Sequence, residues 1–444
     1  MDKNKLAQNF NFYKLMKFSI PTMIMMIFMS LYQTIDGIFI SNLVGELALT
    51  ALNVVYPFSS VVIAIAVMLA SGSSAIIAMN MGRGEKEQSR ENFSFIILVA
   101  IILSICISIL TLIFIKPFIY FLGATPKIYT LCYDYLEIMI LSTPLATLQL
   151  LFQIFFVTAG KPKLGLILTV SSGIANIILD ALFISIFNLG IRGAAIATSI
   201  GYSITAIFGI FYFLLYRNGE LYFVKPKFRI NVLLKSCING SSEMVNNVAV
   251  AITTIIFNIV GIKFLREEGV AAISIVLYAQ FFMTAVFIGY SNGIAPIFSY
   301  KYGADDTTQI KYLFKTSIKF IIVLSIFVFL LSFVVAKPIA MVFASNNKYV
   351  LDLAIHGFYL FSVSFLFTGI NIFASSLFTA FSNGLVSGIL SFLRTFIFLV
   401  VSLLLLPNFI GADGIWLAVP LAETVSIIFS VIFIYLYRKN YNFV

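Results

Sequence analysis

Four polar residues in the first half of this chain lie inside apolar segments, where ionisable and amide side chains are costly. They are Asp36, Asn176, Asp180 and Thr198. At a helical rise of about 1.5 Å per residue, Asp36, Asp180 and Thr198 each lie about 10–12 Å from the outer end of their segments. Asn176 precedes Asp180 by four residues and therefore shares its helix face. The four could bind Na⁺ through oxygen ligands, share a proton between two carboxylates, or only join helices.

Other ionisable residues lie inside apolar segments of the second half. We interpret Glu243 and Glu423, together with Gln153 of the first half, as candidates for substrate binding or gating, with a polar contact between helices as the alternative. Arg394 could pair with an acid, but we expect it to extend towards the cytoplasmic surface, as basic side chains near a membrane do. The single histidine, His356, is expected to form a hydrogen bond near the outer surface.

The composition places these residues in a membrane protein. Of 444 residues, 61% are hydrophobic and 10% are charged, whereas a soluble chain has about 25% charged residues. We predict an all-α integral membrane protein, because helices satisfy their own backbone hydrogen bonds in lipid. Each of twelve apolar segments reaches the roughly 20 residues that a bilayer requires. The predicted spans are 17–43, 52–80, 93–118, 130–157, 163–187, 190–216, 231–261, 270–299, 312–336, 349–380, 384–406 and 413–437.

Basic residues predict the orientation. With the N-terminus inside, 21 of the 28 Lys and Arg residues fall on the cytoplasmic side and seven fall outside. Cytoplasmic segments are enriched in Lys and Arg, so both termini are expected in the cytoplasm. The net charge of +10 then reflects topology and contact with anionic lipid headgroups, and no nucleic-acid partner is expected.

The two halves of the chain repeat each other at an offset near 221. Residues 70–72 match 291–293, residues 158–159 match 379–380, and residues 189–193 match 410–414. We therefore predict two pseudo-symmetric six-helix bundles around a central cleft, with an N-lobe at 1–216, a cytoplasmic linker at 217–230 and a C-lobe at 231–444. Such duplication is typical of secondary transporters, whose site lies between the repeats.

Several chemistries have no motif in this sequence. There is no P-loop, no metalloprotease motif and no serine-hydrolase motif, so an enzyme is disfavoured and no cofactor is expected beyond a coupling ion, H⁺ or Na⁺. No metal site is expected apart from Na⁺ at the four residues of the first half. The abundant Phe and Tyr residues could stack on organic cations, although most are expected to contact lipid or other helices.

Together these segments resemble the multidrug and toxic compound extrusion (MATE) transporters, and in particular their DinF-type branch. The resemblance covers essentially the whole chain, and its motifs are specific only in combination. They are Asp36-Gly-Ile-Phe-Ile-Ser-Asn-Leu-Val-Gly45, Gly82-Arg-Gly84, Ala175-Asn-Ile-Ile-Leu-Asp180, Leu189-Gly-Ile-Arg-Gly193 with Thr198, and Ile410-Gly-Ala-Asp-Gly-Ile-Trp416.

The resemblance implies a monomeric efflux pump for amphipathic, mostly cationic compounds, driven by H⁺ or Na⁺ antiport with alternating access. It also implies that Asp36, Asn176, Asp180 and Thr198 form the coupling site, and that the first helix bends at Pro21. A second cation site of the family would require Glu243 and an acid in the tenth span. The candidate in that span is Asn371, which is neutral, so this second site looks incomplete.

Two other functions compete with drug export. A lipid or lipid-linked oligosaccharide flippase of the same superfamily is expected to carry several basic residues for pyrophosphate, whereas the charges inside these spans are mainly acidic. A passive channel or a non-transporting scaffold would not require four acids at membrane depth. The multi-pass protein is expected in the cytoplasmic (inner) membrane.

Overall fold

The computed structural model describes residues 5–344 and 347–443, except for the side chains of residues 33, 34, 36–38, 41, 42, 46 and 267. Helix is the only regular secondary structure in these residues, as lipid burial of the backbone requires. In chain order the helices are α1 (Phe12–Phe39), η1 (Ile40–Val44), α2 (Glu46–Gly82), α3 (Lys86–Ile113), α4 (Ile115–Phe121), α5 (Tyr129–Thr158), α6 (Pro162–Asp180), η2 (Ala181–Ile186), α7 (Gly190–Leu215), α8 (Ile230–Gly303), α9 (Thr307–Ala344), α10 (Lys348–Ser362), α11 (Phe365–Ala380), α12 (Gly384–Phe392), η3 (Leu393–Phe398), α13 (Leu399–Ile410) and α14 (Asp413–Tyr437).

The twelve predicted spans correspond to helices. Among the described residues, eleven helical stretches are long and apolar enough to cross a membrane, and α10 with α11 makes a twelfth when the pair is counted as one span. Helix α8 contains two of the eleven, Ile230–Arg266 and Glu268–Gly303, which meet at Arg266 with φ 59°. We call these the first and second spans of α8.

The tenth span differs from the continuous helix expected at 349–380. Helices α10 and α11 meet at an angle of 55°, with Val363 and Ser364 between them. The Ser362 hydroxyl donates to the Tyr359 carbonyl, 2.7 Å away, just before this break. Hydroxyls that bond to nearby carbonyls compete with the helical ladder, which accounts for a bend that no proline or glycine marks.

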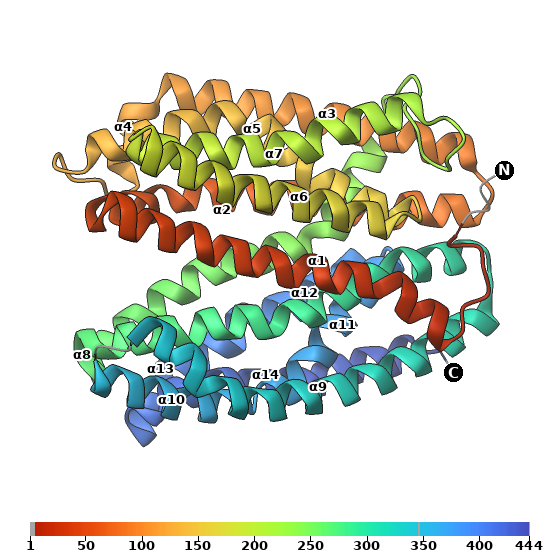
Figure 1. Ribbon diagram of the computed structural model, residues 1–444. Coiled ribbons are helices and arrows are strands. Elements are labelled where there is room, and N and C mark those ends of the chain that lie inside the picture. Colours follow the sequence, from red (N-terminus) through yellow and green to blue (C-terminus); the bar gives the residue numbers. More distant parts are fainter. Residues whose placement is uncertain (1–4, 345–346, 444) are drawn as a thin grey trace.

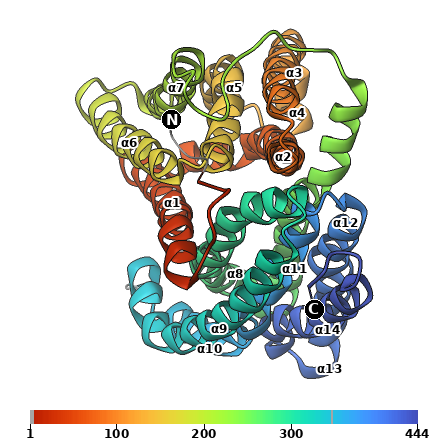
Figure 2. The same cartoon turned by 90° about the vertical axis from the view of Figure 1, so that its right-hand side faces the viewer.

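The helices form two bundles that follow the two halves of the sequence. Figure 1 shows α1–α7 on one side of the molecule and α8–α14 on the other, and the end-on view in Figure 2 separates the same two groups. The bundles meet where α8 packs against α1 and α2. Both described chain ends, at Lys5 and Phe443, lie at one end of the molecule, which we call the terminus-bearing end.

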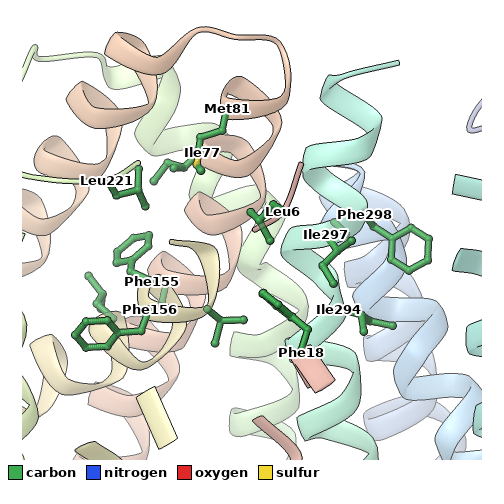
Figure 3. Close-up of a cluster of buried hydrophobic side chains, with 14 of the residues drawn as sticks. Leu6, Phe18, Ile77, Met81, Phe155, Phe156, Leu221, Ile294, Ile297 and Phe298 are labelled. Carbon is green, nitrogen blue, oxygen red and sulfur yellow. The ribbon is translucent and has the colours of Figure 1, made fainter. Parts of the chain in front are cut away.

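The bundles share a buried apolar core near the terminus-bearing end. The short segment before α1 takes part in this core, because Leu6 is fully buried and Phe10 is 3% exposed. Figure 3 shows Leu6 between Ile77 and Met81 of α2 and Ile297 and Phe298 of α8. The N-terminal segment therefore fills space between the two bundles.

The connection between α7 and α8 is bound to the N-terminal bundle. The buried carboxylate of Glu91 on α3 forms ion pairs of 2.5 Å with Lys227 and 2.8 Å with Arg229. The Val224 amide donates to the Ser94 hydroxyl at 3.0 Å. These contacts hold residues 224–229 against α3.

Candidate functional site

A polar site lies where α6 meets α7 in the N-terminal bundle. Asp180 ends α6 and is fully buried, and Asn176, one turn earlier, is 3% exposed. The Asn176 amide donates to the Thr198 hydroxyl of α7 at 3.4 Å. The structure therefore brings together three of the four residues predicted for ion coupling, and their oxygen atoms are of the kind that Na⁺ prefers.

The fourth predicted residue, Asp36, belongs to α1. This helix packs against α6, and η1, which follows α1, contacts η2, which follows Asp180. The side chain of Asp36 lies outside the described residues, so its approach to Asp180 stays a prediction.

Polar groups continue along the same face of α6. The Ser172 hydroxyl hydrogen-bonds with the Thr205 hydroxyl at 2.9 Å, and the Gln153 amide donates to the Thr169 hydroxyl at 3.1 Å. Residues 169, 172, 176 and 180 are three or four positions apart and therefore share a face. This polar stripe leads from Asp180 towards the terminus-bearing end, and it places Gln153 inside the N-terminal bundle.

Three π-helical segments in the described chain adjoin ionisable residues. Segment η1 follows the turn of α1 that holds Asp36, η2 begins directly after Asp180, and η3 contains Arg394. Such segments interrupt the regular ladder and are frequent at functional sites. Asp36 and Asp180 thus lie beside the points where the backbone departs from ideal α-helix, a feature that the sequence did not reveal.

Pro21 lies inside α1, as predicted, and the helix continues through it from Phe12 to Phe39. One turn of α1 beside this proline packs closely on the second span of α8. A Cβ added at Gly289 of α8 would lie 2.5 Å from the Met23 Cα. A bend at Pro21 would change this contact between the bundles; whether the helix bends there stays a prediction.

The C-terminal bundle holds a second buried polar cluster. One oxygen of Glu423, on α14, accepts a 2.6 Å hydrogen bond from the Asn371 amide of α11. The Asn371 oxygen accepts in turn from the Ser430 hydroxyl at 2.8 Å. The other Glu423 oxygen lies 3.9 Å from Nε of Arg394, whose side chain is 14% exposed.

Arg394 therefore corrects one expectation. An arginine that extends to the cytoplasmic surface was predicted, but the guanidinium instead pairs with Glu423 inside the bundle. The prediction was wrong because spacing along the chain cannot show that η3 and α14 lie side by side. By contrast, the hydrogen bond expected for His356 is confirmed, with Asp413 2.8 Å away.

Glu243 lies on the first span of α8 and lines a pocket between the bundles. Its neighbours include the Asn246 side chain and Arg394, whose positive charge attracts the carboxylate. Polar pocket residues come from both bundles. They are Ser71 and Ser74 of α2, Asn292 and Ser299 of α8, and Ser376 and Thr379 of α11.

Comparisons with known proteins agree on one family. The MatE family model matches twice, at residues 21–182 and 244–404, which supports the predicted duplication. The multidrug export protein MepA of Staphylococcus saprophyticus is 24% identical over 437 residues, covering 97% of this chain and 94% of that protein. A crystal structure of MATE in complex with MaL6 superposes with a TM-score of 0.94 at 20% identity over 99% of both chains. An outward-facing multidrug resistance MATE transporter of the MOP superfamily superposes with a TM-score of 0.93 at 21% identity, again over 99% of both chains.

Proposed function

The chain belongs to the MatE family, and from this premise we propose that it exports amphipathic organic cations by antiport with H⁺ or Na⁺. The protein would act as a monomer in the cytoplasmic membrane, with the terminus-bearing end in the cytoplasm. The similarity to multidrug export proteins over nearly the whole chain supports drug efflux. The assignment as a transporter rather than an enzyme rests on the same relatives.

The residues that line the pocket between the bundles support the proposal that the substrates are cations. Among the described residues that line it, Glu243 is the only ionisable one, and no lysine or arginine is present. An acid surrounded by hydroxyl and amide groups attracts a positive charge and offers no partner for a phosphate. A site between repeats is where secondary transporters bind substrate.

Ion coupling is assigned to the N-terminal bundle. Asp36, Asn176, Asp180 and Thr198 would hold Na⁺ through their oxygens, or the two carboxylates would share a proton. Binding there would change the packing of α1, which contacts both α6 and α8. The position of α1 between the site and the other bundle supports this route from ion binding to movement of the bundles.

The experiment is ethidium efflux from energised cells that lack their own pumps. Wild type is expected to export dye uphill, whereas Asp36→Asn and Asp180→Asn are expected to fail at normal expression. Asp134→Asn is the matched control, because Asp134 is an acid that pairs with Arg192 near a helix end and is not one of the four predicted coupling residues. Collapsing the proton gradient while keeping a sodium gradient then identifies the ion. Equal export by all variants would contradict the coupling site, and no export by wild type would contradict the function.

A further inference from the structure

Three ionisable residues from separate helices meet inside the C-terminal bundle. Glu243 comes from the first span of α8, Arg394 from η3 and Glu423 from α14. Segment η3 packs against both α8 and α14, and Arg394 lies 3.9 Å from Glu423 and close enough to Glu243 to attract its carboxylate. We call Glu243, Arg394 and Glu423 the C-terminal triad.

The two acids of the triad differ in their partners. Glu423 is 7% exposed and is held by Asn371, whose own oxygen is bonded by Ser430. Glu243 instead lines the pocket between the bundles. Glu423 is thus a fixed internal group, whereas Glu243 is the carboxylate available to a ligand.

Arg394 is loosely attached to Glu423. Its Nε lies 3.9 Å from the carboxylate oxygen and makes no hydrogen bond to any described group. Strong guanidinium–carboxylate hydrogen bonds are about 2.7–2.9 Å long. The guanidinium therefore has room to shift towards Glu423 when another positive charge occupies Glu243.

The net charge of the triad determines how many positive charges a ligand needs in order to neutralise it. When both carboxylates are ionised, they and the guanidinium together carry a single negative charge. In the low dielectric of a membrane interior, an unbalanced charge is costly. One positive charge in the pocket balances the triad, whereas a dication leaves an excess positive charge.

We propose that Arg394 determines the charge specificity of export, as an internal counter-ion that shares Glu243 with the substrate and favours monovalent over divalent organic cations. This inference rests on the proposed export of organic cations through the pocket that Glu243 lines. It adds a specificity residue that lies outside the pocket and acts through the carboxylate.

The test compares ethidium with propidium, which share a phenanthridinium ring but carry one and two positive charges. Both dyes are measured by uptake into inside-out membrane vesicles and by fluorescence anisotropy on the purified full-length protein. Arg394→Gln gives the triad two negative charges and is expected to raise the propidium-to-ethidium ratio about tenfold, which corresponds to one well-placed charge. Arg394→Lys keeps the charge and is expected to keep the wild-type ratio.

Two further variants distinguish an effect of charge on the dye ratio from a distortion of the fold by the Arg394 substitution. Arg394→Gln combined with Glu423→Gln restores one negative charge and is expected to restore the wild-type ratio. Glu423→Gln alone leaves a neutral triad and is expected to weaken binding of both dyes, propidium more than ethidium. An unchanged ratio in Arg394→Gln, or an equal shift in Arg394→Lys, would overturn the proposal. If wild type binds the dyes but does not move them, the proposed export fails, while the binding ratios still decide the role of Arg394.

Discussion

Gly82 of α2 and Gly303 of α8 make equivalent contacts across the boundary between the two bundles. A Cβ atom added at Gly82 would overlap the carbonyl oxygen of Tyr300, and one added at Gly303 would overlap the carbonyl oxygen of Met79. Positions 79 and 82 are related to 300 and 303 by the repeat offset of 221. The internal duplication has thus produced a symmetric crossing of two helices, in which the backbones meet near the terminus-bearing end.

The first prediction concerns this crossing. Gly82→Ala is expected to hold the bundles apart at the terminus-bearing end, because the added methyl group meets a backbone carbonyl that cannot rotate away. Overpacking of this kind costs about 1–3 kcal/mol. If export proceeds by alternating access, as we propose, it requires this closure, and export of ethidium is expected to fall about tenfold at normal expression.

Labelling of the pocket measures the closure directly. In a variant without native cysteines, Ser74→Cys of the pocket is expected to react faster with a reagent added on the cytoplasmic side when Gly82→Ala is present. Gly165→Ala is the control, because its added Cβ makes only ordinary contacts of 3.6 and 3.9 Å within the N-terminal bundle. Unchanged labelling together with normal export in Gly82→Ala would contradict a role in closure.

The second prediction concerns the N-terminal segment. Leu6 is fully buried between the bundles, so Leu6→Ala removes apolar contacts that exist only when the bundles meet. Large-to-small substitutions in a core cost about 2–5 kcal/mol. Export is expected to fall, and Ser74→Cys is expected to become more reactive from the cytoplasm. Tyr13→Ala, at a side chain that is 69% exposed, is expected to change neither export nor labelling. A similar loss of export in both variants would contradict a specific role for the buried Leu6 side chain between the bundles.

The third prediction concerns the connection between the bundles. Glu91→Gln removes the carboxylate that binds Lys227 and Arg229, so trypsin is expected to cut after these residues several-fold faster in membrane vesicles that expose the cytoplasmic side. Glu87→Gln, in the exposed first turn of α3, serves as the control. Equal cleavage rates in the two variants would mean that Glu91 does not fix the connection.

The positions of the membrane spans and the internal duplication could be predicted from the sequence, but contacts between side chains of distant segments could not. Apolar length located all twelve spans, because a bilayer sets the length of a helix. The offset of 221 indicated the duplication, which the double match of the family model supports. Asn176 and Thr198 were expected at one depth, and they form a hydrogen bond.

The errors and omissions arise from packing between helices. The pairing of Arg394 with Glu423 depends on the positions of two helices, and spacing along the chain carries no such information. The burial of Leu6 was missed because a short segment in a polar N-terminal stretch shows no span pattern. The break between α10 and α11 was missed because serine hydroxyls, which also occur in straight helices, mark it.

The fourth prediction separates ion binding from transport. A ligand that binds only the folded protein stabilises it by about 2.7 kcal/mol at a hundred times its dissociation constant. If Na⁺ binds at Asp180, replacing potassium chloride by sodium chloride is expected to raise the melting temperature of the purified protein. If the proton is the coupling ion, lowering the pH is expected to do so instead, because a folded state that binds more protons gains stability.

In either case Asp180→Asn is expected to abolish the ion-dependent shift, because Asp180 is the fully buried carboxylate of the polar site. Asp134→Asn, which removes an acid paired with Arg192 near a helix end, is expected to retain the shift. The melting temperature is recorded without dye or membrane potential, so the result does not depend on export. A shift that persists in Asp180→Asn but disappears in Glu243→Gln would move the coupling site to the C-terminal bundle, since Glu243 is the acid that lines the pocket there.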